Sequence, residues 1–123
     1  MKNANMAPSS WPTELRVSPG RDILTVSFDS GERFELGAEY LRVESPSAEV
    51  RGHGGGPKLL VTGKEDVKIA RLEPVGNYAV RIVFDDGHDS GLYGWDFLLK
   101  LGREHDRIWA AHLAAAHLAA SQP

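Results

Sequence analysis

Two segments of the chain alternate apolar and polar residues and end in the same way. Residues 24–28 and 80–84 each place two aliphatic side chains and a phenylalanine on one face at a period of two, which is the pattern of a half-buried β-strand. An Asp-x-Gly sequence follows each segment, at 29–31 and 85–87. Because glycine readily adopts the positive φ that tight turns require, the pattern predicts two β-hairpins built alike, the first of which returns through residues 33–36.

Turn signals predict two further strands. Residues 13–17 lead into Pro-Gly at 19–20, and residues 67–72 lead into a Pro-Val-Gly-Asn run at 74–77; both sequences favour turns. Together these segments imply an antiparallel sheet of about five strands. One face of such a sheet is apolar and needs a cover.

The C-terminal segment supplies the predicted cover. Between residues 104 and 120, Trp109, Leu113, Ala116 and Ala120 recur at helical spacing, and alanine is the strongest helix former. We predict a helix here whose apolar side lies on the sheet. The alternative is that this side faces a second chain, so the protein is expected to be a monomer or a weak homodimer.

Three shorter elements complete the prediction. Residues 93–101 are expected to form a turn or helix, ended by Gly102 as a C-terminal cap. Residues 37–43 favour a short helix, and the Gly-rich run at 51–57 favours a loop.

The composition fits one globular domain. The chain has 123 residues, of which 41% are hydrophobic and 25% charged, the ordinary make-up of a single core. We therefore expect one α+β domain over residues 11–120, behind a disordered leader at 1–10. Its predicted fold is a small antiparallel β-sheet of about five strands, built from hairpins and covered by C-terminal helices.

Cysteine content and charge exclude several classes of protein. The chain has no cysteine, which excludes disulfide frameworks, thiolate nucleophiles, iron–sulfur ligation and Cys-type zinc fingers and suits the cytoplasm. A net charge of -3 offers no general attraction to a phosphate backbone, so nucleic acid is not an expected partner. No apolar stretch approaches the roughly 20 residues that span a membrane.

Three stretches carry a resemblance to a known family. They are Tyr-Leu-Arg at 40–42 with Ser-Pro-Ser-Ala-Glu-Val-Arg at 45–51, Gly-His-Gly at 52–54, and Asp-Gly-His-Asp-Ser-Gly-Leu-Tyr-Gly-Trp at 86–95 with Leu98. From about residue 11 to 101 the chain resembles the N-terminal domain of gamma-butyrobetaine hydroxylase-like proteins. Such domains occur alone in bacteria, in front of oxygenase domains, and attached to iron–sulfur carrier ATPases.

The resemblance also implies a difference in metal binding. In the oxygenase-linked relatives a Cys-x-Cys-x-x-Cys arrangement and one histidine hold a zinc ion. The resemblance places Ser45, Ser47 and Val50 at the cysteine positions and His88 at the histidine position. Hydroxyl groups and a valine cannot replace thiolates in a tetrahedral site, so we expect neither this zinc ion nor another cofactor.

The histidines allow only weak alternatives. His88 follows a predicted hairpin turn between two aspartates, so it either fixes this loop or titrates and accepts a metal with a carboxylate. His53 is the other loop histidine that would converge with it, and the pair would still need a carboxylate. Three histidines of the last helix are separated by seven and five residues, unlike the i, i+4 pairs that bind metals.

No catalytic constellation is present, so the sequence predicts a binding module. Neither a Gly-x-Ser-x-Gly nor a His-Glu-x-x-His motif occurs. The Gly-rich loop lacks the Gly-Lys-Ser/Thr end of a phosphate loop.

The leading hypothesis is a non-catalytic accessory domain that docks on an unidentified protein partner, with a link to iron–sulfur or metal handling suggested by the relatives. The alternative is a small-molecule or weak metal-binding domain. That alternative would use His53 and His88. The candidate residues for binding a protein partner are Arg42, His53, His88, Tyr93 and Trp95, with core packing as the competing role for the two aromatic residues.

Overall fold

The computed structural model describes residues 11–46 and 60–121. The elements in chain order are β1 (Pro12–Val17), β2 (Ile23–Phe28), β3 (Arg33–Gly37), α1 (Ala38–Val43), β4 (Ile69–Val75), β5 (Ala79–Phe84), β6 (Gly91–Gly94), α3 (Trp95–Arg103) and α4 (His105–Ala120). The predicted leader and the Gly-rich loop, which contains His53, lie outside the described residues.

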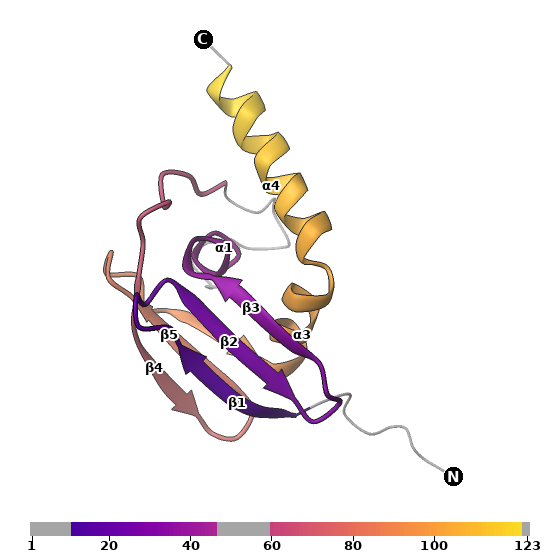
Figure 1. Ribbon diagram of the computed structural model, residues 1–123. Helices are drawn as coiled ribbons and strands as arrows, with labels where there is room; N and C mark the ends of the chain where they lie inside the picture. Colours follow the sequence, from indigo (N-terminus) through magenta and orange to yellow (C-terminus); the bar gives the residue numbers. More distant parts are fainter. Residues whose placement is uncertain (1–10, 47–59, 122–123) are drawn as a thin grey trace, which may run out of the picture.

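The strands form two antiparallel sheets of three, in the orders β1-β2-β3 and β4-β5-β6 (Figure 1). The α+β class and the antiparallel hairpins are thus confirmed, while the prediction of one sheet of about five strands is corrected. Each third strand runs directly into a helix at a glycine, Gly37 or Gly94, with φ near -69° and -68°. The chain therefore leaves the first sheet through α1 before β4 begins, and the two sheets stay separate.

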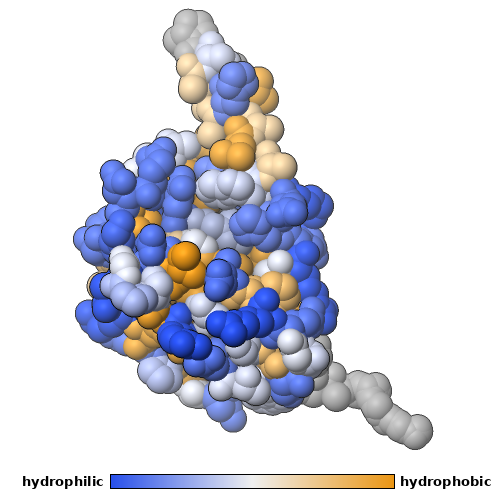
Figure 2. All heavy atoms as spheres, viewed as in Figure 1, coloured by the Kyte–Doolittle hydropathy of each residue, from blue (hydrophilic) through white to orange (hydrophobic). Residues whose placement is uncertain are grey.

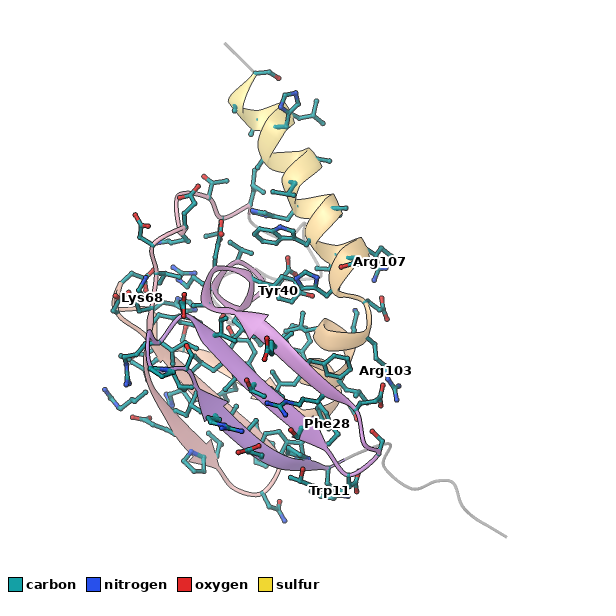
Figure 3. The ribbon with its side chains drawn as sticks, in the orientation of Figure 1. Trp11, Phe28, Tyr40, Lys68, Arg103 and Arg107 are labelled. Carbon is teal, nitrogen blue, oxygen red and sulfur yellow. The ribbon has the colours of Figure 1, made fainter. Side chains whose placement is uncertain are left out.

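The two halves of the chain repeat one backbone design. Asp29 and Asp85 each accept a backbone N–H from the residue that precedes the first strand of the half, Trp11 at 3.1 Å and Lys68 at 3.0 Å. Trp11 and Lys68 are labelled in Figure 3. Their own N–H groups donate back to the same two residues, each at 2.9 Å. The turn glycines that follow have φ of 95° and 93°. The prediction of two hairpins built alike is confirmed by these matching bonds.

One predicted helix is partly a strand. Tyr93 pairs with Val80 across the second sheet, so residues 91–94 form β6 and the helix begins only at Trp95. Gly102, predicted as a helix cap, lies inside α3. A Cβ atom there would overlap the Phe34 ring. The glycine is needed because α3 packs closely on β3.

The core lies between the sheets and the helices α1 and α3. Its largest fully buried side chains are Tyr93, Phe84, Leu24, Leu36, Leu41, Ile69, Ile82, Leu98, Leu101, Val26 and Val80. Arg21, in the left-handed region at φ 63°, joins the sheets: its Nε donates to the Ile69 carbonyl at 2.9 Å, and the Ile69 N–H donates to the Arg21 carbonyl at 2.8 Å. The buried core contains side chains from both halves of the chain, and these two hydrogen bonds link the sheets.

The C-terminal helix is confirmed, but its predicted role as the cover of the sheet is not. No residue of α4 is buried, and the helix projects from the body of the molecule (Figure 1). Only its base packs, with Ile108 and Trp109 against the core and the Trp109 ring 5.8 Å from Tyr40. The cover is supplied instead by α1 and α3. Among the described residues, no helix has the length and apolar character to cross a membrane.

Candidate functional site

Two buried tyrosines hold α1 against the second half of the chain. The Tyr93 hydroxyl donates to the Leu41 carbonyl at 2.5 Å, and the Tyr40 hydroxyl donates to the Leu101 carbonyl at 2.7 Å (Figure 3). Burial raises the pKa of both hydroxyls above the ordinary tyrosine value. Both side chains therefore act as neutral donors that fix the helix in position.

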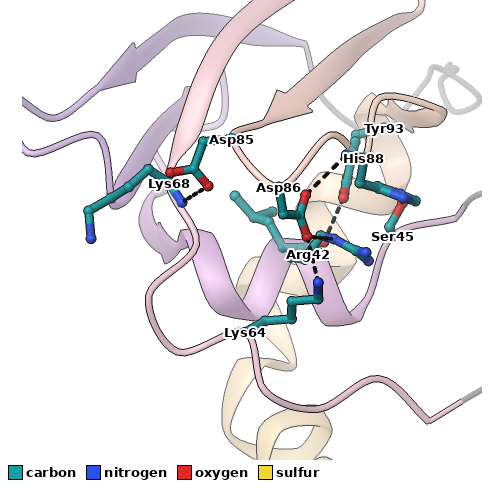
Figure 4. A network of polar contacts seen from close by, with 9 residues as sticks. Arg42, Ser45, Lys64, Lys68, Asp85, Asp86, His88 and Tyr93 are labelled. Carbon is teal, nitrogen blue, oxygen red and sulfur yellow. Dashed lines mark hydrogen bonds and ion pairs between the residues drawn. The ribbon is translucent and has the colours of Figure 1, made fainter.

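A carboxylate with two cations lies at the end of the β5–β6 hairpin. Asp86 accepts hydrogen bonds from Arg42 at 2.9 Å and from the His88 amide at 3.0 Å, and Lys64 lies 2.8 Å away (Figure 4). Burial alone would raise the pKa of Asp86, but the bonds from Lys64, the His88 amide and Arg42 outweigh it and hold the pKa well below its usual range. The carboxylate stays charged and ties three segments of the chain together.

Ser45 and His88 meet beside this carboxylate. The Ser45 Oγ and the His88 Nε2 are 2.9 Å apart, and the serine is only 6% exposed. Gly91 faces them, and a Cβ atom there would overlap the Ser45 Oγ. A glycine in this strand is thus required by the serine that occupies the space.

These two residues stand at positions where the resemblance implied metal ligands. Ser47 and Val50, the other two such positions, lie outside the described residues. A serine hydroxyl bonded to an imidazole is a hydrogen-bonded pair that lacks the thiolates of a tetrahedral zinc site. Within residues 11–46 and 60–121 no group of three or more histidine and acidic side chains is placed to hold a metal ion. The donor set that the structure describes does not fit the relatives' zinc.

The predicted contact residues do not form one surface. Arg42 and His88 lie together around Asp86, whereas Tyr93 is fully buried beneath them. Trp95 is at the other end of the β5–β6 pair, where its ring N–H donates to the Asn77 carbonyl at 2.9 Å. His53 lies outside the described residues. Sequence reasoning did not identify Lys64, because its ion pair with Asp86 joins distant segments.

A cavity that the sequence did not predict lies beside the base of α4. It has a volume of about 370 Å³, and it is surrounded mostly by apolar residues from the end of α1, the segment before β4, α3 and α4. Its lining residues are Val43, Glu44, Leu60, Val61, Phe97, Lys100, Leu101, Arg107, Ile108, Ala111, His112 and Ala115. We call this cavity with the adjoining side of α4 the α4 groove.

The Asp86 and Ser45 contacts shape this groove indirectly. Val43 and Glu44 line the cavity, and they are bracketed by Arg42, which is bound to Asp86, and by Ser45, which is bonded to His88. The family motif therefore fixes the end of α1 that forms one wall of the groove.

The apolar surface continues outward along α4. From Ile108 to Ala120 the helix has no Asp, Glu, Lys or Arg. Leu113 is 51% exposed and Leu118 is 62% exposed. Figure 2 shows orange and tan surface along much of the projecting helix, whereas the body is mainly blue and white with smaller orange areas.

Comparison with solved structures finds similar folds at substantial identity. Two proteins with NMR solution structures are 42% and 41% identical, with TM-scores of 0.80 and 0.78; the first match covers 98% of this chain and 90% of that protein, the second 90% and 87%. A crystal structure of a DUF971 family protein of unknown function from Acidithiobacillus ferrooxidans is 37% identical, with a TM-score of 0.62, over 73% of this chain and 90% of that one. No match was found among curated proteins.

A family model supports the same relationship. The model described as gamma-butyrobetaine hydroxylase-like, N-terminal, matches residues 15–99. This range includes the second half of β1, all the other strands, α1 and the first half of α3, and it contains the Arg42, Asp86 and His88 cluster. The chain belongs to the gamma-butyrobetaine hydroxylase-like, N-terminal family.

Proposed function

We propose that the chain is a non-catalytic, cytoplasmic protein-binding module that docks through the α4 groove. The observation that carries this proposal is the state of α4: it is a 16-residue helix with no buried residue. A surface helix of a globular domain normally has a polar side facing water. This helix is uncharged beyond Arg107, which favours a protein surface as its neighbour.

The energetics support a partner of this kind. Burying a leucine side chain fully contributes about 1.5–3 kcal/mol, and α4 leaves Leu118, on the groove side of the helix, 62% exposed. Contiguous exposed apolar surface beside a cavity is a feature of interaction sites. The groove thus offers more binding energy than the Arg42 and His88 cluster, whose polar groups are already engaged inside the molecule.

The cluster has a supporting role in the proposal. It holds the end of α1 in place, so the groove wall is formed before a partner arrives, and preformed sites lose less entropy on binding. The relatives that are attached to iron–sulfur carrier ATPases suggest a partner concerned with iron–sulfur or metal handling. That link is an analogy within the family.

Affinity capture with matched variants tests the proposal. The immobilised wild-type chain, Ala111→Glu, Leu118→Glu and Leu113→Glu are exposed to native lysate, and bound proteins are quantified by mass spectrometry. Ala111 lines the cavity, and Leu118 continues its side of the helix, whereas Leu113 lies about 140° around the helix from Leu118. We expect a protein retained by the wild type and by Leu113→Glu to be lost by the other two. Equal retention by all four chains would remove the support for the groove as a docking site.

A further inference from the structure

We propose that the partner at the α4 groove is a second copy of this chain, with the two α4 helices antiparallel. This inference rests on the proposed function, because it names the protein that covers the same surface. It starts from a stripe of four residues on α4, which we call the groove stripe: Ile108, Ala111, Ala115 and Leu118.

The groove stripe has the spacing of a helix-pairing seam. Its members are separated by three, four and three residues, the a and d spacing that faces a partner helix in a coiled coil. Ile108, Ala111 and Ala115 line the cavity, while Leu118 is 62% exposed beyond it. One end of the stripe therefore lines a cavity, which we call the hole. The other end is the exposed Leu118 side chain, which we call the knob.

This arrangement is complementary to itself. When two stripes run antiparallel about a two-fold axis near their centre, Leu118 of each copy comes beside Ile108 and Ala111 of the other, at the cavity. A cavity of about 370 Å³ has room for a leucine side chain. Each copy would then provide one knob and one hole, so both contacts form together.

The charges agree with this pairing. The four residues of the groove stripe carry no charge, so their contact with one another buries no charged side chain of the stripe. In the antiparallel arrangement the C-terminal end of one α4 comes to the base of the other, where Lys100 and Arg107 line the cavity. A helix C-terminus carries a partial negative charge, so it is attracted by these two cations, which outnumber the one acidic residue of the lining, Glu44.

Sedimentation velocity with complementary variants tests this inference. Leu118→Glu and Ala111→Lys each place a charge in both apolar contacts of their own homodimer. In their mixture, a heterodimer has one Glu–Lys pair and one wild-type contact. We expect the wild type to associate between about 10 μM and about 1 mM, each variant to dissociate at least about tenfold more readily, and the mixture to recover association. Leu113→Glu, on another side of the helix, should behave as the wild type.

Several outcomes would overturn the inference. A wild type that remains monomeric over this range would do so, as would folded variants whose mixture shows no recovery, with folding checked by circular dichroism. If the wild type is monomeric while Leu118→Glu still loses a protein captured from lysate, the second copy is wrong and the proposed docking function stands. If Leu118→Glu changes neither association nor capture, both proposals fail.

Discussion

Asp86 is the residue at which charges from three parts of the chain meet. Its side chain is 19% exposed, and it binds Arg42 and Lys64 as well as the His88 amide. Neither cation is near it in sequence, so its importance depends on the tertiary fold.

This geometry predicts a dependence of stability on pH. The pKa of Asp86 is held below its ordinary value of 3.8, so the folded state binds this proton less readily than the unfolded chain. The stabilisation is complete above about pH 4 and is lost as the pH falls toward the depressed pKa of the folded protein. We expect Asp86→Asn to lower the free energy of unfolding at neutral pH by about 1–2 kcal/mol. The variant should also lose less of its free energy of unfolding than the wild type when the pH is lowered.

Urea denaturation between about pH 2 and pH 7 measures this effect, across the range in which carboxylates titrate. Asp89→Asn, in the same loop, is the matched control and should keep the wild-type profile. An Asp86→Asn profile parallel to that of the wild type would contradict the assignment.

At this scale the sequence identified part of the cluster. The family motif indicated Arg42 and His88, and it indicated Ser45 through its place among the relatives' metal ligands. That Ser45 bonds His88, and that Gly91 leaves room for it, follows from the packing of α1 on β6. Such a contact between segments over 40 residues apart cannot be read from local patterns.

Among the elements, the hairpins were predictable and the boundary between strand and helix was not. Alternation at 24–28 and 80–84 has one explanation, a half-buried strand. The run 92–99 is apolar enough for either element, and Gly94 alone marks the change. In α4, alanine on every side makes several apolar faces equivalent, so the pattern showed a helix but not which face packs.

The contact between α3 and β3 gives a prediction for Gly102. Alanine in an exposed helix interior is ordinarily more stable than glycine by about 1 kcal/mol. Here a Cβ atom would overlap the Phe34 ring, so we expect Gly102→Ala to destabilise the fold by about 1–3 kcal/mol.

A double-mutant cycle separates the clash from the helix propensity. In a Phe34→Leu background the ring is absent, and the same substitution should become neutral or stabilising. The measurement is the urea midpoint of the four proteins. A destabilisation that persists in the Phe34→Leu background would show that the ring is not the cause.

The whole molecule is held together by contacts that cross between its halves. The Tyr40 hydroxyl donates to the Leu101 carbonyl in α3, and the Tyr93 hydroxyl donates to the Leu41 carbonyl in α1. Arg21 joins the two sheets. Composition predicted one core, and these contacts lead us to expect that neither half folds independently.

Cooperative unfolding is the expected consequence. Tyr93→Phe leaves the Leu41 carbonyl without its buried donor, which costs about 1–3 kcal/mol. Because the halves unfold together, amide hydrogen exchange should accelerate by a similar factor in β2 and in β5. Leu113→Glu, at an exposed site of α4, is the control that should leave both strands unchanged. Acceleration confined to one sheet would contradict a single cooperative unit.

The same type of turn occurs in both halves of the chain, so one turn can serve as the control for the other. Gly31 and Gly87 have nearly equal positive φ, 95° and 93°, and no neighbour that would obstruct a methyl group, yet only the second turn leads into the residues that anchor α1. The same glycine-to-alanine substitution at each site therefore introduces similar backbone strain. A difference between the two losses of stability therefore reports the tertiary contacts beside each turn: Glu32 with Arg103 at the first, and Asp86 with Arg42 and Lys64 at the second.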